Sequence, residues 1–168
     1  MDVLWKVRGK QPPNPLKSRL IAQGSLTERV RETCPLHFHV NVLRQYWASP
    51  FADEARLLKL SPFGYARIRE VELCCGNNPI VFARTVIPVS SLRGGLRHLL
   101  KLGTQPLGEV LFTQRAQRIN PQICRLKSNH PLFQMLSIRL EQKPPELWMR
   151  RSIFILKNKP LLVQEIFL

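Results

Sequence analysis

Residues 65–92 read YARIREVELCCGNNPIVFARTVIPVSSL, and this stretch decides the fold. Two runs rich in Val, Ile, Leu and Phe flank the turn sequence GNNP at residues 76–79. Strand-forming residues on both sides of Gly, Asn and Pro are typical of an antiparallel β-hairpin. We therefore predict two paired strands here, and we expect the other strands of the chain to join them in one sheet.

One charged side chain lies on the apolar face of the first predicted strand. Because successive side chains of a strand point to alternate faces, Arg69 shares its face with Val71 and Leu73. A buried charge without a partner is costly. Arg69 therefore either pairs with a carboxylate of its own chain or binds one on a ligand, and residue type alone leaves both interpretations open.

The composition is that of a strongly basic protein. The 168 residues include 26 Lys and Arg against 11 Asp and Glu, a formal charge of +15 at pH 7. A chain of this length can bury a full core, so we expect a single domain over residues 1–168. The charge favours an anionic partner, which includes nucleic acid, an acidic membrane surface and a small polycarboxylate.

The four cysteines form no recognisable framework. Cys34 and Cys124 stand alone in the sequence, whereas Cys74 and Cys75 are neighbours on a predicted strand and point to opposite faces. No CxxC spacing is present. We therefore expect reduced thiols in a cytoplasmic protein, with neither a zinc site nor a redox motif.

The first residues do not have the pattern of a targeting segment. Pro12, Pro13 and Pro15 interrupt a region that lacks a continuous apolar core, so we expect no signal peptide. Residues 1–14 are expected to form a flexible basic tail. No run approaches the 18 apolar residues of a membrane span, although peripheral contact with a membrane remains open.

Short helices are predicted on both sides of the hairpin. Residues 16–32 carry apolar residues at helical spacing, and a break at Gly24, followed by a capping box that begins with Ser25, divides them in two. Further short helices are expected within residues 91–103 and from residue 106. Because the first N–H groups of a helix lack partners, the segment around Leu107 can bind an anion or simply water.

A strand is also predicted before the hairpin. Residues 36–42 alternate strictly between apolar and polar, and the phase slips at Leu43, which indicates a β-bulge. His37 and His39 share one face of this strand, but since no third ligand is evident we expect no bound metal. Residues 48–63 are expected to form a loop.

The C-terminal part predicts a weak strand over residues 113–124, a long polar insertion over residues 125–147 and then a closing hairpin. Two runs, at residues 148–156 and 161–168, flank the turn sequence KNKP. Both faces of the last strand are largely apolar, so Glu165 is expected to be screened from water. Such a carboxylate either pairs with Arg69 or serves in proton transfer.

Together these elements predict an α+β fold. It contains about six strands in antiparallel hairpins, with short helices covering one face of the sheet. No phosphate-binding glycine loop and no local signature of a Ser/His/Asp or Cys/His nucleophile is present.

Five segments resemble one known family. RIREVELC, ARTVIPVSSL, KLGTQPLGEVLFT, WMRRSIFIL and KPLLVQEIFL, which together span residues 67–168, are similar in the same order to segments of chorismate pyruvate-lyase, the 4-hydroxybenzoate synthase of quinone biosynthesis. The resemblance implies a six-stranded antiparallel sheet with helical flaps over a small site. It also implies conversion of chorismate to 4-hydroxybenzoate and pyruvate without a metal or cofactor.

The resemblance further implies which residues form the site. The arginine that binds the substrate carboxylate in this family falls on Arg69, and the acidic residue of the family falls on Glu165. A main-chain contact falls on Leu107. A flap position that is methionine in familiar members falls on Leu26, in the segment SLTERV.

Arg84 is a further candidate for binding the substrate. Chorismate carries two carboxylates that are ionised near neutrality, so a site for it needs more than one oriented donor group. Arg84 lies on the strand next to Arg69 and could bind the second carboxylate. The competing interpretation is a structural pair with Glu70 or Glu72.

Two other classes of function stay open at this point. Effector domains of some transcription regulators share this type of fold, so the chain could sense a small aromatic carboxylate without turning it over. The charge of +15 would suit nucleic acid, but the charges are dispersed and no aromatic and basic RNA-binding motif is present, so we expect no specific nucleic-acid partner. We expect a cytoplasmic monomer whose product feeds ubiquinone or plastoquinone synthesis.

Overall fold

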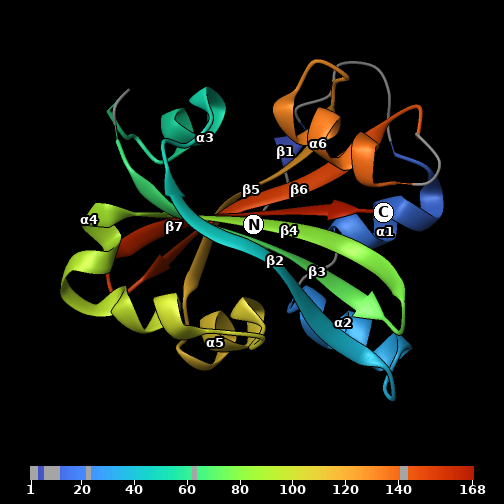
Figure 1. Cartoon of the computed structure of the whole chain (residues 1–168), viewed down its shortest axis with the longest axis horizontal. Helices are drawn as coiled ribbons and strands as arrows, with labels where there is room; N and C mark the ends of the chain where they lie inside the picture. Colours follow the sequence, from blue (N-terminus) through green and yellow to red (C-terminus); the bar gives the residue numbers. More distant parts are fainter. Residues whose placement is uncertain (1–3, 6–11, 22–23, 62–63, 141–143) are drawn as a thin grey trace.

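One curved sheet of seven strands organises the protein (Figure 1). The structure, a computed structural model, describes residues 4–5, 12–21, 24–61, 64–140 and 144–168. The strand order is β1-β5-β6-β7-β4-β3-β2, and every neighbouring pair is antiparallel except β1 with β5. The predicted α+β class is confirmed, and six of the strands form the antiparallel part that we expected.

The seventh strand comes from the segment that we expected to be a tail. β1 (Leu4–Trp5) is two residues long and pairs in parallel with β5. The rest of residues 1–11 lies outside the described residues. A strand of two residues has too little sequence to show any period, so no pattern could have predicted it.

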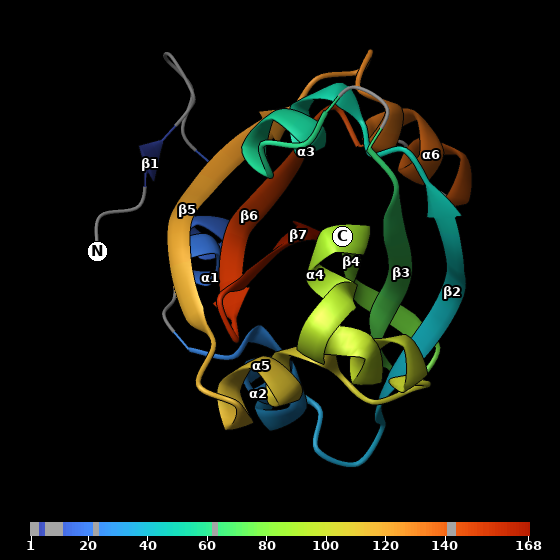
Figure 2. The ribbon, with the colours of Figure 1, turned by 90° about the vertical axis from the view of Figure 1, so that its left-hand side faces the viewer.

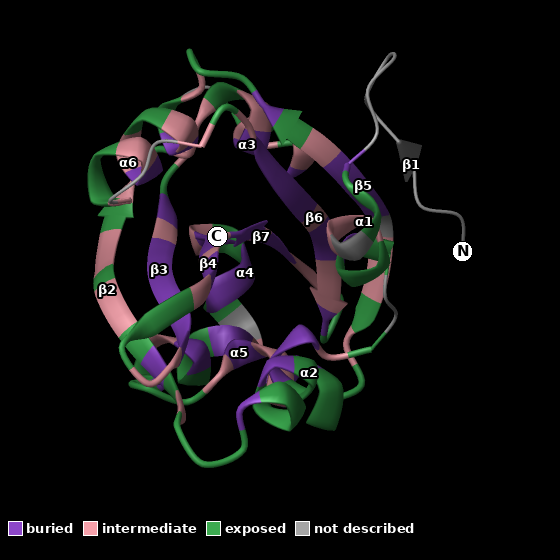
Figure 3. Cartoon of the chain, turned by 90° about the vertical axis from the view of Figure 1, so that its right-hand side faces the viewer, coloured by how far each residue is buried: buried purple, intermediate pink, exposed green. Residues whose placement is uncertain are grey.

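The hairpin predicted from residues 65–92 forms the middle of the sheet. β3 (Ala66–Cys75) and β4 (Asn78–Pro88) pair along their length, with Arg69 opposite Thr85. Both strands are buried over most of their length, as Figure 3 shows, because elements pack on both faces of the sheet. This position explains why their sequences are apolar with little alternation.

The remaining strands extend this hairpin on both sides. On one side lies β2 (Phe38–Ala48), whose register with β3 shifts between Val42 and Arg44, so the predicted bulge is confirmed. On the other side the closing hairpin, β6 (Leu147–Leu156) and β7 (Lys159–Phe167), places β7 next to β4. β5 (Gln117–Leu126) then pairs with β6.

Helices α1 (Asn14–Ile21), α2 (Leu26–Thr33) and α5 (Leu107–Thr113) cover one face of the sheet, α2 and α5 in contact at one end (Figure 2). The predicted break at Gly24 separates α1 from α2, and Ser25 Oγ accepts a hydrogen bond from the Glu28 N–H (3.3 Å). Between β4 and α5 the chain forms α4 (Val89–Ser91), a π-helical turn (Leu92–Leu96) and a 3-10 helix (Arg97–Lys101).

Two further helices cover the opposite face, so our expectation of helices on one face only was wrong. α3 (Ala52–Leu57) lies within the predicted loop, and α6 (Pro131–Arg139) lies within the predicted polar insertion. α6 buries Leu132 and Leu136 in a cluster with side chains of β4, β6 and β7. Helices of six and nine residues are too short to show a clear helical period in the sequence.

A disulfide joins Cys34 to Cys75, with their Cα atoms 5.8 Å apart, and this corrects our expectation of reduced thiols. Cys34 is the C-cap of α2 and Cys75 is the last residue of β3, so the bond fixes the end of α2 to the central hairpin. The two residues are 41 positions apart, and only the fold brings them together. Among the described residues, no helix is long and apolar enough to cross a membrane.

Candidate active site

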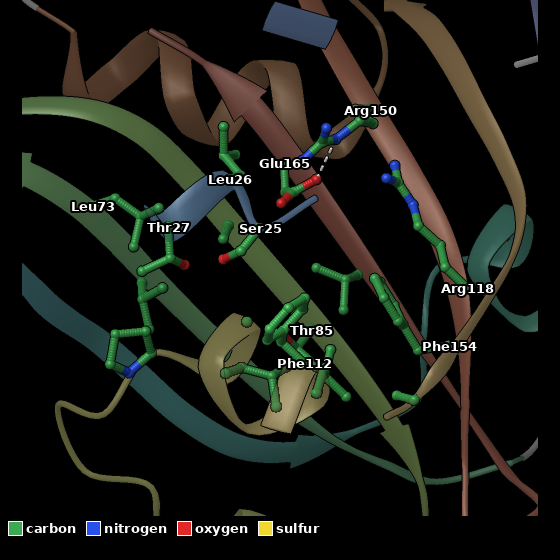
Figure 4. A pocket seen from close by; sticks show the side chains of 18 of the residues that line it. Ser25, Leu26, Thr27, Leu73, Thr85, Phe112, Arg118, Arg150, Phe154 and Glu165 are labelled. Carbon is green, nitrogen blue, oxygen red and sulfur yellow. Dashed lines mark hydrogen bonds and ion pairs between the residues drawn. The ribbon is translucent and has the colours of Figure 1, made fainter. Parts of the chain in front are cut away.

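A cavity of about 230 Å³ lies between the sheet and helices α2 and α5 (Figure 4). Its walls are mainly apolar and include Leu26, Val40, Leu73, Leu111, Phe112 and Phe154. Its polar lining includes Ser25, Arg69, Thr85, Arg118, Arg150 and Glu165. An apolar hollow with a few convergent polar groups is typical of a site for a small ligand.

Arg69 lines this cavity from β3 and is 2% exposed. Its guanidinium donates hydrogen bonds to the carbonyl oxygens of Gly103 (2.8 Å) and Gln105 (3.1 Å). No carboxylate of the described residues pairs with it, so an internal ion pair is not the reason for its burial. Burial lowers the pKa of Arg69. A buried cation that carbonyl groups hold in place, without a neutralising charge, is suited to an anionic ligand.

The two hydrogen bonds of Arg69 also position a helix. Gly103 and Gln105 belong to the turn that precedes α5, and Leu107 is the first residue of α5. Leu107 is buried and lines the cavity, so the start of this helix faces the same space as Arg69. The first N–H groups of a helix have no acceptor within the helix, which makes them available to a ligand.

Leu26 occupies the corresponding position on α2. It is the first residue of that helix, is buried and lines the cavity. The starts of α2 and α5 touch, because a Cβ atom on Gly108 would lie only 2.9 Å from Thr27 Oγ1. Leu26 and Leu107 therefore close the same side of the cavity from two neighbouring helices.

Glu165 lines the cavity from β7, and its partner is Arg150 rather than Arg69. Arg150 lies directly opposite on β6, and its Nε donates a hydrogen bond to Glu165 Oε2 at 2.6 Å. The side chain of Glu165 is 17% exposed, as expected for a carboxylate that is largely screened from water. The described residues offer no donor to its other oxygen, Oε1.

Arg118, on β5, brings a third cation to the cavity. Figure 4 shows its guanidinium on the same side of the cavity as Arg150 and Glu165. Its Nε donates a hydrogen bond to Ser152 Oγ at 2.8 Å. Burial, and then the charge of Arg150, lower the pKa of Arg118, while the charge of Glu165 acts in the opposite direction.

Arg118 and Arg150 were not among the predicted site residues. Arg150 lies in the segment WMRRSIFIL, and strand alternation places it on one face with Trp148 and Phe154, so it was recognisable, like Arg69, as a charge on an apolar face. Arg118 carries no such signal. Its strand was predicted only weakly, and the register between β5 and β6 shifts between Ile119 and Gln122.

Arg84 does not line the cavity with the other predicted residues. It lies on the opposite face of β4, where Nε and Nη2 donate hydrogen bonds to Glu54 at 2.7 and 3.1 Å and Nη1 donates to Glu70 at 2.5 Å. All three side chains are buried. Burial would lower the pKa of Arg84, but the hydrogen bonds that it donates to Glu54 and Tyr46, together with the charges of these residues, outweigh burial and the pKa is raised. The structural alternative therefore applies to Arg84, and its role in binding the second carboxylate was a wrong prediction.

The charges in the cavity are unequal. The described lining residues include three cations, Arg69, Arg118 and Arg150, but only one carboxylate, that of Glu165. Two positive charges are therefore in excess. The described residues contain no group of three or more His, Cys, Asp or Glu side chains that could hold a metal ion. The cavity is therefore built to attract a small molecule with more than one negative charge.

Comparison with known sequences gives one consistent family. A sequence model of the chorismate lyase family matches residues 2–168. A protein of Nitrosomonas europaea named probable chorismate pyruvate-lyase is 39% identical over 165 residues, which cover 98% of this chain and 92% of that protein. One of Aromatoleum aromaticum with the same name is 40% identical over 167 residues, covering 95% of this chain and 90% of that protein.

Comparison with solved structures gives a likeness of fold. The effector domain of PhnF from Mycobacterium smegmatis matches with a TM-score of 0.61 and 11% identity, covering 88% of this chain and 90% of that domain. The ligand-binding domain of a GntR-family transcriptional regulator from Bordetella bronchiseptica matches with a TM-score of 0.53 and 16% identity, covering 78% and 82%. At such identities the match concerns the fold alone.

Proposed function

Because the chain belongs to the chorismate lyase family, we propose that it converts chorismate to 4-hydroxybenzoate and pyruvate. One observation supports this proposal most directly. Arg69 and Glu165 line the same cavity, yet each is held by other groups and they do not pair with each other. A cation and an acid are thus available at separate points of a space that can hold one small aromatic acid.

The reaction requires correct positioning of the substrate more than a strong nucleophile. The enolpyruvyl ether bond at ring carbon C3 breaks, the hydrogen on C4 is lost, and the ring becomes aromatic. The three-carbon fragment gains a proton on its methylene carbon and leaves as pyruvate. Because aromatisation makes the reaction strongly favourable, a rigid site with one group that manages a proton is sufficient.

The residues take the following roles in this proposal. The Arg69 guanidinium and the Leu107 N–H bind the ring carboxylate, which is the kind of oxyanion that such donors favour. Glu165 accepts a hydrogen bond at the C4 oxygen end and assists the cleavage of the ether, and its Oε1 is the atom without a protein donor among the described residues. Leu26 supplies apolar bulk that closes the site over the ring. We expect the reaction to need no metal and no cofactor.

The product would supply the aromatic ring of a quinone, either ubiquinone or plastoquinone. We further propose a cytoplasmic monomer without a specific nucleic-acid partner, as expected from the sequence. The Cys34–Cys75 disulfide bears on the location, because disulfides are rare in cytoplasmic proteins. Trapping the thiols in intact cells before lysis would establish which redox state accompanies the cytoplasmic fraction.

A direct assay tests the activity. Purified protein is incubated with chorismate, and 4-hydroxybenzoate and pyruvate are measured separately over time. Equal amounts of the two products, in proportion to enzyme concentration, are the expected result. Tight binding of 4-hydroxybenzoate without any turnover would instead indicate a ligand-sensing module and would contradict the proposed activity.

A further inference from the structure

Arg118 has more hydrogen-bonding capacity than its protein neighbours use. A guanidinium carries five N–H donors, and toward the described residues that of Arg118 uses only Nε, which donates to Ser152 Oγ. Its two terminal nitrogens have no acceptor among the described residues. Since these nitrogens form the planar fork that matches a carboxylate, Arg118 is suited to bind one in the cavity that it lines.

The position of Arg118 defines which carboxylate it can reach. It lies on the same side of the cavity as Glu165 and Arg150, as Figure 4 shows, and Arg150 is already engaged with Glu165. Burial of Arg118, and then the charge of Arg150, disfavour its charged form, and the charge of Glu165 offsets this only in part, because the pKa stays lowered. An anion between the two arginines would remove that cost.

The substrate carries a carboxylate that fits this position. In chorismate the ring carboxylate on C1 is opposite the C4 hydroxyl, and the enolpyruvyl ether on C3 is next to C4. If the proposed function holds, with the ring carboxylate at Arg69 and the C4 oxygen at Glu165, the enolpyruvyl group must lie on the Glu165 side. We propose that Arg118 binds the carboxylate of the enolpyruvyl group and so holds the leaving three-carbon fragment during cleavage.

The two carboxylates of the substrate make this proposal testable. Chorismate has both, whereas 4-hydroxybenzoate keeps only the one assigned to Arg69. Arg118→Ala should therefore lower kcat/KM for chorismate by about 30-fold or more, the smallest loss usual for truncating one member of a buried charge pair. Its affinity for 4-hydroxybenzoate should change by less than about 3-fold, since that ligand has no group for Arg118. Arg118→Lys keeps the charge but not the planar pair of donors. Its kcat/KM for chorismate should therefore lie between those of Arg118→Ala and the unmodified protein.

Arg125→Ala is the matched control, because Arg125 lies on the same strand, is exposed and does not line the cavity. It lowers the overall charge equally and should leave both measurements unchanged. Retained affinity of Arg118→Ala for 4-hydroxybenzoate, measured by titration calorimetry, also shows that the variant is folded.

Three outcomes are decisive. A kcat/KM for chorismate equal to that of the unmodified protein would overturn the role of Arg118. So would an equal loss of 4-hydroxybenzoate affinity, because that would place Arg118 at the ring or in the framework. If the unmodified protein binds chorismate without turnover, the proposed function fails, and the dissociation constants of chorismate for the unmodified protein and Arg118→Ala still test the subsite by the same 30-fold criterion.

Discussion

Arg150 and Glu165 face each other on adjacent strands, and the Arg150 Nε donates a 2.6 Å hydrogen bond to the Glu165 carboxylate. Arg69 takes no part in this pair, because its guanidinium is held by the carbonyl groups of Gly103 and Gln105. The ion pair also fixes the carboxylate through Oε2, while no residue that the structure describes donates to Oε1. The cavity therefore holds a cation and a carboxylate that do not neutralise each other, since each is bound by other groups.

Glu165→Gln should lower turnover of chorismate by about 100-fold or more, because an amide keeps the shape of the side chain but cannot exchange a proton as a carboxylate does. The dissociation constant of 4-hydroxybenzoate should change only a few-fold. Steady-state kinetics and calorimetry on the same preparation check both expectations. Glu109→Gln is a suitable control, since Glu109 pairs with Arg31 and does not line the cavity. Near-normal turnover of Glu165→Gln would exclude a proton-transfer role.

Arg69→Ala should weaken binding of 4-hydroxybenzoate by about 2–5 kcal/mol, the range for removing one partner of a buried charge pair. Part of that loss would come from the turn before α5, because the substitution also removes the hydrogen bonds to Gly103 and Gln105. Arg69→Lys separates the two effects, as it retains the charge while losing the paired donors. Unchanged titrations with 4-hydroxybenzoate would remove Arg69 from the site.

The sequence was sufficient to predict most of the sheet, but it did not predict the helices that pack on the second face of the sheet. The two hairpins and the bulge at Leu43 follow from local alternation and turn residues, so they were predictable. α3 and α6 are short, and their stability depends on burial against the sheet rather than on their own periodicity. The Cys34–Cys75 bond likewise depends on the fold and not on spacing.

The missed helix α3 explains the error about Arg84. Glu54, the main partner of Arg84, lies in that helix and is completely buried. Because its segment was expected to be a loop, there was no reason in the sequence to expect an ion pair between Glu54 and Arg84. Arg69 and Glu165 were predicted as candidates because each is a charge in an apolar strand. Arg118 was missed because β5 is an irregular strand, in which alternation does not show the direction of a side chain.

Arg84→Met should destabilise the protein by about 3–5 kcal/mol, because it leaves the carboxylate of Glu54 buried without its cation and Glu70 with Arg44 as its only cation among the described residues. Urea denaturation measures this loss, and the affinity of the folded fraction for 4-hydroxybenzoate should stay the same. Arg139→Ala serves as the comparison. It removes the ion pair of the half-exposed Arg139 side chain with Glu72, which keeps its hydrogen bond from Asn41, and should cost clearly less than Arg84→Met. A loss of 4-hydroxybenzoate affinity in Arg84→Met without a loss of stability would show that Arg84 takes part in ligand binding.

The Cys34–Cys75 disulfide should contribute to stability and to retention of the product. Cys34→Ser is expected to lower the free energy of unfolding by about 2–4 kcal/mol, the usual range for a native disulfide. The dithiothreitol-treated protein should show the same loss. Because the bond fixes the C-terminal end of α2, whose first residue, Leu26, lines the cavity, its removal should also speed the release of 4-hydroxybenzoate.

Denaturation with and without dithiothreitol, and stopped-flow release of 4-hydroxybenzoate, check these two effects separately. Cys124→Ser provides the control, since Cys124 lies outside the disulfide and this variant should keep the full sensitivity to dithiothreitol. In Cys34→Ser that sensitivity should be absent, because no bond is left to reduce. Faster release with unchanged stability would show that the bond acts on α2 alone. If dithiothreitol alters neither quantity in the unmodified protein, the position of α2 is set by its packing against α5 and the sheet, and the disulfide has no part in closing the cavity.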